Sequence, residues 1–175
     1  MKYIIVGGTS GIGLAAAKMA VDAGHEVIAV GRDPGKFPAA QSIGAATAQV
    51  DAANLAECQR FFASQGAFDH LVLCASGSAG AGSFRDLALE DLRKGFEGKF
   101  WPQITCAKAA LASLNAEASI TFVGAISSRA MKPGTAGLAA INAALEAMVP
   151  ILASELRPTR VNAVVPGGVD TPWWS

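Results

Sequence analysis

The sequence predicts an α/β fold in which a doubly wound parallel sheet, with strand order 3-2-1-4-5-6, lies between two layers of helices. Three observations support this prediction. The chain opens with an apolar run that leads into a glycine-rich loop, and further apolar runs alternate with helical patterns. Several of these runs are continuous rather than alternating in polarity, which is typical of parallel strands that helices cover on both faces.

The expected elements follow in order along the chain. Strands are expected over residues 3–6, 26–30, 47–50, 70–74, 119–123 and 160–165. Helices are expected over residues 12–23, from Asn54 onward, over 87–114 with interruptions near Gly95, Gly98 and Pro102, and over 138–156 with a kink at Pro150.

The helix that begins near Asn54 carries a start signal. Asn54 is followed three residues later by Glu57, which is a capping-box pattern. The spacing of the apolar residues after it predicts a face that turns toward the core, formed by Leu55, Cys58, Phe61 and Phe62.

Composition fits a single domain over residues 1–175. Hydrophobic residues make up 51% of the chain, enough for a sizeable core, and 14 Lys and Arg balance 14 Asp and Glu. This neutral balance argues against a nucleic acid or an anionic membrane as partner. We find no apolar run near the roughly 18 to 20 residues that span a bilayer and no signal peptide, so we expect a cytoplasmic protein. The scattered Cys58, Cys74 and Cys106 predict buried thiols rather than a metal site or disulfide.

The glycine-rich loop after the first strand predicts a nucleotide site. Gly7 would allow a sharp turn, Gly11 would let backbone approach a pyrophosphate, and Gly13 would let the helix lie close to the sheet. The start of that helix offers free N–H groups and a partial positive charge to phosphate. The candidate cofactor contacts in this loop are Gly7, Thr9, Ser10, Gly11, Ile12 and Gly13.

The end of the second strand indicates which dinucleotide binds. An acidic residue at this point would accept hydrogen bonds from a ribose 2′-hydroxyl, whereas Arg beside a small residue suits a 2′-phosphate. Gly31 and Arg32 therefore favour NADP(H), and Ser10 could donate to the same phosphate. The alternative is that Arg32 is a solvated loop residue beside Asp33.

With these motifs in place, the chain resembles the short-chain dehydrogenases/reductases over essentially its whole length, which implies a Rossmann fold. The resemblance implies that Asp51 holds the adenine amino group and that Cys74, Ala75 and Ser76 stand where the family usually has Asn-Asn-Ala. The segment from Arg160 resembles the family's sixth strand and its following turn. In relatives that turn contacts the nicotinamide, which gives this role to Pro166, Gly167, Val169 and Thr171.

The catalytic positions depart from the family pattern. Relatives carry a Tyr four residues before a Lys on one helix, and here Leu138 and Asn142 occupy those positions, while Gly124 or Ala125 replaces the family Ser. Lys99 stands where relatives have an Asn, so Asn and Lys have traded helices. We name Lys99, Asn142 and Ser127 as catalytic candidates, with Lys99 reaching toward Asn142. The alternatives are a solvated helix lysine, an ordinary helix Asn and a polar loop serine.

The resemblance implies an NADP(H)-dependent oxidoreductase that transfers hydride between nicotinamide and a small carbonyl or alcohol substrate. The alternative is a catalytically silent NADP(H)-binding regulatory module. Complete relatives continue past the last turn with a segment that covers the substrate and with a seventh strand, both of which we expect this chain to lack. Relatives form dimers through the corresponding helices, so a homo-oligomer, dimer or tetramer, is expected.

Overall fold

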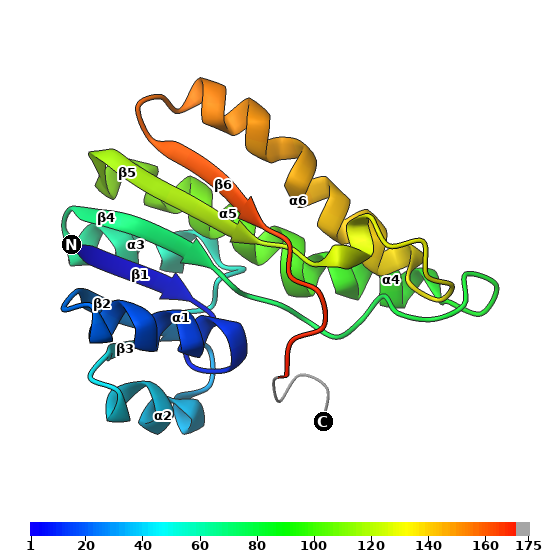
Figure 1. Ribbon diagram of the computed structural model, residues 1–175, viewed down its shortest axis with the longest axis horizontal. Coiled ribbons are helices and arrows are strands. Elements are labelled where there is room, and N and C mark those ends of the chain that lie inside the picture. Colours follow the sequence, from blue (N-terminus) through cyan, green and yellow to red (C-terminus); the bar gives the residue numbers. More distant parts are fainter. Residues whose placement is uncertain (171–175) are drawn as a thin grey trace.

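The computed structural model describes residues 1–170 as one parallel sheet with helices on both faces (Figure 1). The strand order is β3-β2-β1-β4-β5-β6, which confirms the predicted fold class and topology. All neighbouring strands pair in parallel. The strands are β1 (Lys2–Val6), β2 (Glu26–Gly31), β3 (Ala46–Gln49), β4 (Phe68–Leu73), β5 (Leu114–Val123) and β6 (Arg160–Val164).

All six expected strands are present, and β5 differs most from its expected bounds. It begins at Leu114 rather than residue 119, because Leu114 pairs with Phe68 at the start of β4. The register shifts between Phe68 and His70, so the added residues join the sheet through an irregular pairing. This extension is not marked by an apolar run in the sequence, because residues 115–117 are exposed and include Asn and Glu.

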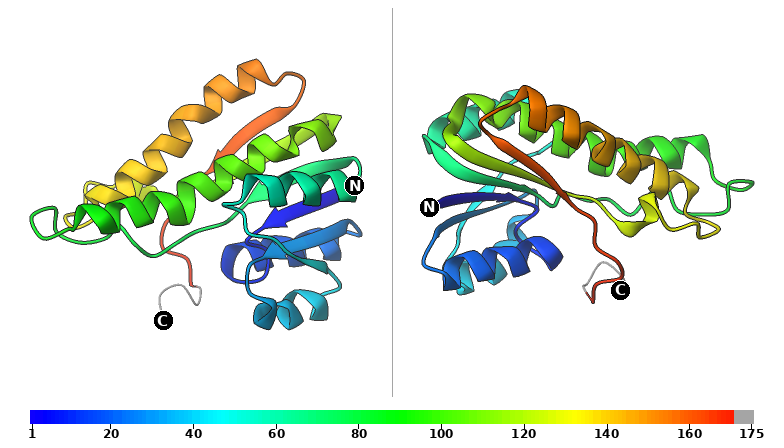
Figure 2. Two further views of the ribbon diagram at one scale, coloured as in Figure 1. Left: turned by 180° about the vertical axis from the view of Figure 1, so that it is seen from behind. Right: turned by 45° about the horizontal axis from the view of Figure 1, so that its top comes forward.

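The helices form two layers that can be followed in Figure 2. One face of the sheet packs against α3, α5 and α6, and the other packs against α1 and α2. The bounds are α1 (Gly11–Asp22), α2 (Phe37–Ser42), α3 (Leu55–Gln65), α4 (Leu89–Gly95), α5 (Trp101–Ala110) and α6 (Ala136–Glu155). Short turns of helix are η1 (Pro34–Lys36), η2 (Phe96–Phe100), η3 (Leu111–Ser113) and η4 (Ile126–Ser128).

The larger core lies on the α3, α5 and α6 face. Phe62 of α3 and Leu145 of α6 are almost fully buried there against the side chains that alternate strand residues turn to this face. The two smaller helices cover a second cluster around Ile5 and Ala17. Cys58 and Cys106 are buried in the larger core with their sulfurs 3.6 Å apart, which confirms the prediction of buried thiols for this pair.

Three features of the helices differ from the expectations. The sequence analysis did not foresee α2, a six-residue helix with Pro38 in its first turn, because its apolar pattern is too short to stand out. In α3, Asn54 caps the helix by accepting from Glu57 N at 3.1 Å, but the Glu57 carboxylate accepts from Asp51 N instead of closing the box on Asn54. Leu55, the first residue of α3, is 46% exposed and does not face the core.

The segment expected as one interrupted helix is a nearly continuous rod made of α4, η2 and α5 (Figure 2). The interruption at Gly98 is a π-helical turn, η2, rather than a break. Wider turns of this kind are frequent at functional sites. This turn contains Lys99, and Gln103 follows one turn later in α5.

The long helix α6 corrects the expectation about apolar runs. An 18-residue window in α6 has a mean hydropathy of 1.7, so among the helices of residues 1–170 this one meets the length and composition of a membrane span. This apolar stretch is not evident in the sequence because Asn142, Glu146 and Pro150 interrupt the apolar residues. In the fold, Ile141 and Leu145 of α6 are buried within the domain.

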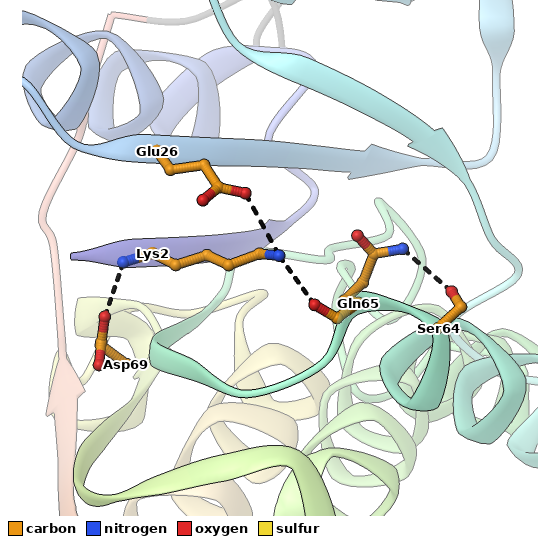
Figure 3. A network of polar contacts seen from close by, with 5 residues as sticks. All are labelled: Lys2, Glu26, Ser64, Gln65 and Asp69. Carbon is orange, nitrogen blue, oxygen red and sulfur yellow. Dashed lines mark hydrogen bonds and ion pairs between the residues drawn. The ribbon is translucent and has the colours of Figure 1, made fainter.

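The start of β1 is held from three sides (Figure 3). The Lys2 backbone N–H donates to Asp69 Oδ2 at 2.7 Å, and its Nζ donates to Gln65 O at 2.8 Å. The same ammonium lies 3.2 Å from Glu26 Oε1 on β2. Hydrogen bonds to Asp69 from Lys2 N–H and Asn115 lower the pKa of that carboxyl. Lys2 thus joins β1 to β2, to β4 and to the end of α3.

Candidate nucleotide and catalytic site

The glycine-rich loop turns sharply away from the end of β1. Gly7 N donates to Val30 O at 2.8 Å, and Gly8 N lies within hydrogen-bond distance of both Ile5 O and Val30 O. Gly7 has φ +79° and Gly11 has φ +52°, in the left-handed region that favours glycine. The backbone of the loop is therefore fixed to β2 while its outer side faces the carboxyl edge of the sheet.

The loop packs closely on its neighbours, and the start of α1 offers backbone donors to a phosphate group. A Cβ on Gly13 would come within 2.8 Å of Gly7 C, and one on Gly7 would come within 2.8 Å of Cys74 C, so both positions exclude side chains. Ser10 precedes α1 without a side-chain cap, which leaves the first N–H groups of the helix free for an anion. Thr9 is buried, and its side chain occupies the space that a Cβ on Gly31 would need.

Arg32 and Asp51 border one open hollow of about 360 Å³, together with Gln49 and Glu57. Gln49 Nε2 donates to Arg32 O at 3.2 Å, which joins the ends of β2 and β3. Asp51 Oδ1 accepts from Ala53 N at 3.0 Å, so the carboxylate is held in a turn. The exposed Arg32 side chain makes no ion pair with any residue of the described range 1–170.

The sequence analysis missed Gln103, which holds together the loops that follow β4 and β5. This side chain is fully buried, and its Nε2 donates to Ala75 O at 3.0 Å and to Val123 O at 3.1 Å. Both acceptors are backbone carbonyls at the carboxyl edge of the sheet, so the amide fixes the spacing of two site segments. The signal in the sequence is an amide four residues after Lys99, on the same helical face.

Lys99 projects from η2 toward the end of β5. Its Nζ donates to Gly124 O at 3.1 Å, and the side chain is partly buried. Burial lowers the pKa of the Lys99 ammonium to about 8, which the nearby Cys74 thiol partly opposes. Burial raises the pKa of Cys74 to about 12, and Lys99 partly opposes that change.

Asn142 lies on α6 on the other side of Gly124. Its Nδ2 donates to Ser127 Oγ at 3.0 Å and to Leu138 O at 2.8 Å, so two of the three catalytic candidates are in direct contact. The expected direct contact between Lys99 and Asn142 is not formed, because Lys99 bonds to the Gly124 carbonyl instead. The two side chains meet around one glycine: Asn142 Oδ1 lies 3.8 Å from the position of a Cβ on Gly124.

The turn after β6 approaches the same place. Ile126 N donates to Pro166 O at 2.8 Å, which ties this turn to the segment that carries Ser127. Gly167 is exposed, and a Cβ added to it would meet no atom within 4 Å. Val169 is 37% exposed. Thr171 and the two tryptophans after it lie outside the described residues.

A family model described as enoyl-(acyl carrier protein) reductase matches residues 6–175. The chain belongs to the short-chain dehydrogenase/reductase family. It is 27% identical over 194 residues to a short-chain dehydrogenase/reductase of Acremonium sp, covering 98% of this chain and 74% of that one. It is 29% identical over 185 residues to another from Stachybotrys chlorohalonatus, covering 95% and 72%.

Solved structures agree with this membership. The crystal structure of a small-chain dehydrogenase in complex with NADPH has a TM-score of 0.84 and 32% identity, covering 99% of this chain and 73% of that one. A short-chain dehydrogenase/reductase of Brucella melitensis has a TM-score of 0.91 and 26% identity, covering 98% and 74%.

In this short-chain dehydrogenase/reductase, an open hollow of about 580 Å³ lies beside the segment that follows β5. Its lining includes Ser127 and Ala139 together with Phe84, Met131 and Lys132. Gly82 N donates to Gly134 O at 2.9 Å, so the loop before α4 and the loop before α6 form its two walls. Both loops extend from the same side of the domain (Figure 1). Ser127, one of the catalytic candidates, therefore borders this hollow.

We expect Gly124→Ser to be more stable than Gly124→Ala by about 1 kcal/mol. A Cβ at position 124 would meet nothing closer than 3.7 Å, and Asn142 Oδ1 and Glu146 Oε1 both lie 3.8 Å from it. Both oxygens are buried and accept no hydrogen bond within residues 1–170, so a serine hydroxyl would supply a missing donor. Urea unfolding of the two variants measures the difference. Equal stability would show that neither oxygen takes the new hydrogen bond.

Proposed function

We propose that the protein is an NADP(H)-dependent oxidoreductase that transfers hydride between nicotinamide and a small carbonyl or alcohol substrate. The observation that carries this proposal is the glycine cradle at the uncapped start of α1, with Arg32 beside it and Lys99 across the carboxyl edge. Ligands of doubly wound sheets bind at this edge, where the strand order reverses. When bound, NADPH supplies the hydride.

The preference for NADP(H) rests on charge. Arg32 is exposed at the end of β2 and free of ion pairs within the described residues, so its guanidinium is available to a 2′-phosphate. The similar structure of a small-chain dehydrogenase, at 32% identity, is a complex with NADPH, which supports the same preference. Asp51, across the hollow, would hold the adenine amino group.

The residues at the catalytic edge have separate proposed roles. Lys99 and Asn142 would orient the nicotinamide ribose through an ammonium and an amide, and Ser127 lies against Asn142 beside the substrate hollow. The cofactor would lie between two segments, one formed by Cys74, Ala75 and Ser76 and the other by Pro166, Gly167 and Val169.

A second candidate function is a silent NADP(H)-binding regulatory module. Leu138 favours it, because this position in relatives carries the tyrosine that gives a proton, and a leucine side chain has none to give. Binding without turnover against a panel of aldehydes and ketones would establish this alternative. The homo-oligomeric assembly and the cytoplasmic location stay predictions.

We expect Arg32→Asp to weaken NADPH binding by about 10- to 100-fold while NADH binding changes little. The substitution removes the guanidinium that would contact the 2′-phosphate and adds a carboxylate that would repel it. Titration of each nucleotide by protein fluorescence measures both affinities, with turnover followed at the nicotinamide absorbance. Arg60, on the exposed surface of α3, offers a control as Arg60→Asp. Parallel losses for NADPH and NADH would contradict the assignment.

A further inference from the structure

We propose that the Lys99 ammonium is the proton donor to the carbonyl oxygen of the substrate during reduction. This inference rests on the proposed function, which assigns Lys99 only to the ribose and leaves the source of the proton open. It begins from a cation that the fold holds at the carboxyl edge of β4 and β5, with no anionic partner among residues 1–170.

Within residues 1–170, the Lys99 ammonium uses one of its hydrogen-bond donors. An ammonium has three N–H donors, and within residues 1–170 only Gly124 O accepts from Lys99 Nζ, at 3.1 Å. No carboxylate in that range forms an ion pair with it. A partly buried cation with two free donors at a ligand-binding edge is suited to an oxygen atom of a bound molecule.

The neighbouring groups are weaker acids or already engaged. The Cys74 thiol, after β4, has its pKa raised to about 12 by burial, so it holds its proton at neutral pH. The Ser127 hydroxyl accepts from Asn142 Nδ2 at 3.0 Å and is an intrinsically weak acid. Burial lowers the pKa of Lys99 to about 8, which is close to the value that suits an acid working near neutral pH.

Two charged side chains near Gly124 form an ion pair with each other. Arg129, after η4, donates from Nε and Nη2 to Glu146 Oε2 on α6, at 3.0 and 2.7 Å. Glu146 Oε1 lies 3.8 Å from the Cβ position of residue 124, on the side of that glycine where Asn142 lies. Arg129 and Glu146 therefore balance each other, whereas the Lys99 ammonium forms no ion pair within residues 1–170.

In the proposed step the carbonyl carbon would gain a hydride as a C–H bond of the NADPH nicotinamide breaks, so that the carbonyl is reduced and NADPH is oxidised to NADP+. The electron pair of the C=O π bond moves onto the oxygen. That oxygen gains a proton as one Nζ–H bond of Lys99 breaks, which gives the alcohol. Lys99 is left as a neutral amine and takes a proton from water before the next turnover.

The test compares the wild-type protein with Lys99→Met, Lys99→Arg and the control Lys108→Met, which removes an exposed lysine of α5. NADPH affinity is measured first by fluorescence, and turnover of an aldehyde and ketone panel is then measured from pH 6 to 10. Wild type should lose reductase kcat above a midpoint near pH 8, because the neutral amine has no proton to give. Lys99→Met should lower kcat by about 10²- to 10⁴-fold and remove this midpoint.

Lys99→Arg keeps the charge but holds its proton, so it should bind NADPH and still turn over slowly. A second readout does not depend on turnover: the ¹⁵N signal of Lys99 Nζ, identified by its loss in Lys99→Met, should titrate near pH 8 and shift when NADPH is added. A wild-type pH profile retained in Lys99→Met, or titration near the ordinary 10.5, overturns the proton role but leaves the proposed function standing. Failure of wild type to bind NADPH or to turn over any substrate overturns both.

Discussion

Gly13→Ala is expected to lower the free energy of unfolding by about 2 to 3 kcal/mol, although alanine is the better helix former. The added Cβ would press on the Gly7 carbonyl and lie 2.8 Å from Gly7 C and 3.0 Å from Gly8 Cα. All three atoms are backbone, and both glycines donate to Val30 O, so the loop can yield only by giving up its attachment to β2. NADPH affinity should fall with stability, because the loop is the proposed pyrophosphate contact.

Gly124→Ala is the matched control for Gly13→Ala, since it adds the same methyl group at a buried glycine. Its Cβ would meet no atom closer than 3.7 Å, so stability should change by less than about 1 kcal/mol. Urea unfolding followed by circular dichroism compares the two variants. A Gly13→Ala protein as stable as Gly124→Ala would mean that α1 lies further from the loop than the structure shows.

Gln103→Met is expected to lower the free energy of unfolding by about 2 to 5 kcal/mol. Methionine nearly preserves the volume, but it removes the two hydrogen bonds to Ala75 O and Val123 O, at 3.0 and 3.1 Å, deep in the protein. Each buried carbonyl without a donor carries a desolvation cost of about 1 to 3 kcal/mol. Because these carbonyls lie in the segments that flank the proposed cofactor site, NADPH affinity should weaken as well.

The control for Gln103 is Gln41→Met in α2. Gln41 Nε2 also donates one hydrogen bond, to Thr47 Oγ1 at 3.1 Å, but on the exposed surface, where water can replace it. Its substitution should change stability by less than about 0.5 kcal/mol. Urea unfolding of both methionine variants gives the comparison, and similar losses would contradict the role assigned to Gln103.

The parts of the fold that depend on local sequence were predictable. The glycine loop and the six strands follow from short runs whose residue types restrict the backbone or demand burial on both faces. The extension of β5 to Leu114 was not predictable, because it depends on pairing with Phe68 rather than on its own composition. The helix α2 was not predictable either, because a six-residue helix is too short to show a clear apolar pattern.

In the site, too, some roles follow from the residue type alone and others depend on contacts that the fold creates. The residue types at Arg32 and Gly13 indicate their chemistry directly, whereas the partner of Lys99 depends on a π-helical turn and on a strand end 25 residues away. The role of Gln103 was not predicted because its acceptors are backbone carbonyls. Every residue has such a carbonyl, so the residue types at Ala75 and Val123 do not indicate the contact. Contacts of this kind become visible only when the sheet has brought the segments together.

The position of β1 also sets an order of events during synthesis. β1 pairs with β2 and with β4, and Lys2 takes its side-chain and backbone partners from Gln65 and Asp69 as well as Glu26. At typical translation rates the ribosome needs about 2 to 8 s to pass from the end of β2 to the end of β4. Until then β1 has one open edge, so the glycine-rich loop that follows it reaches its final surroundings only after β4 has been made.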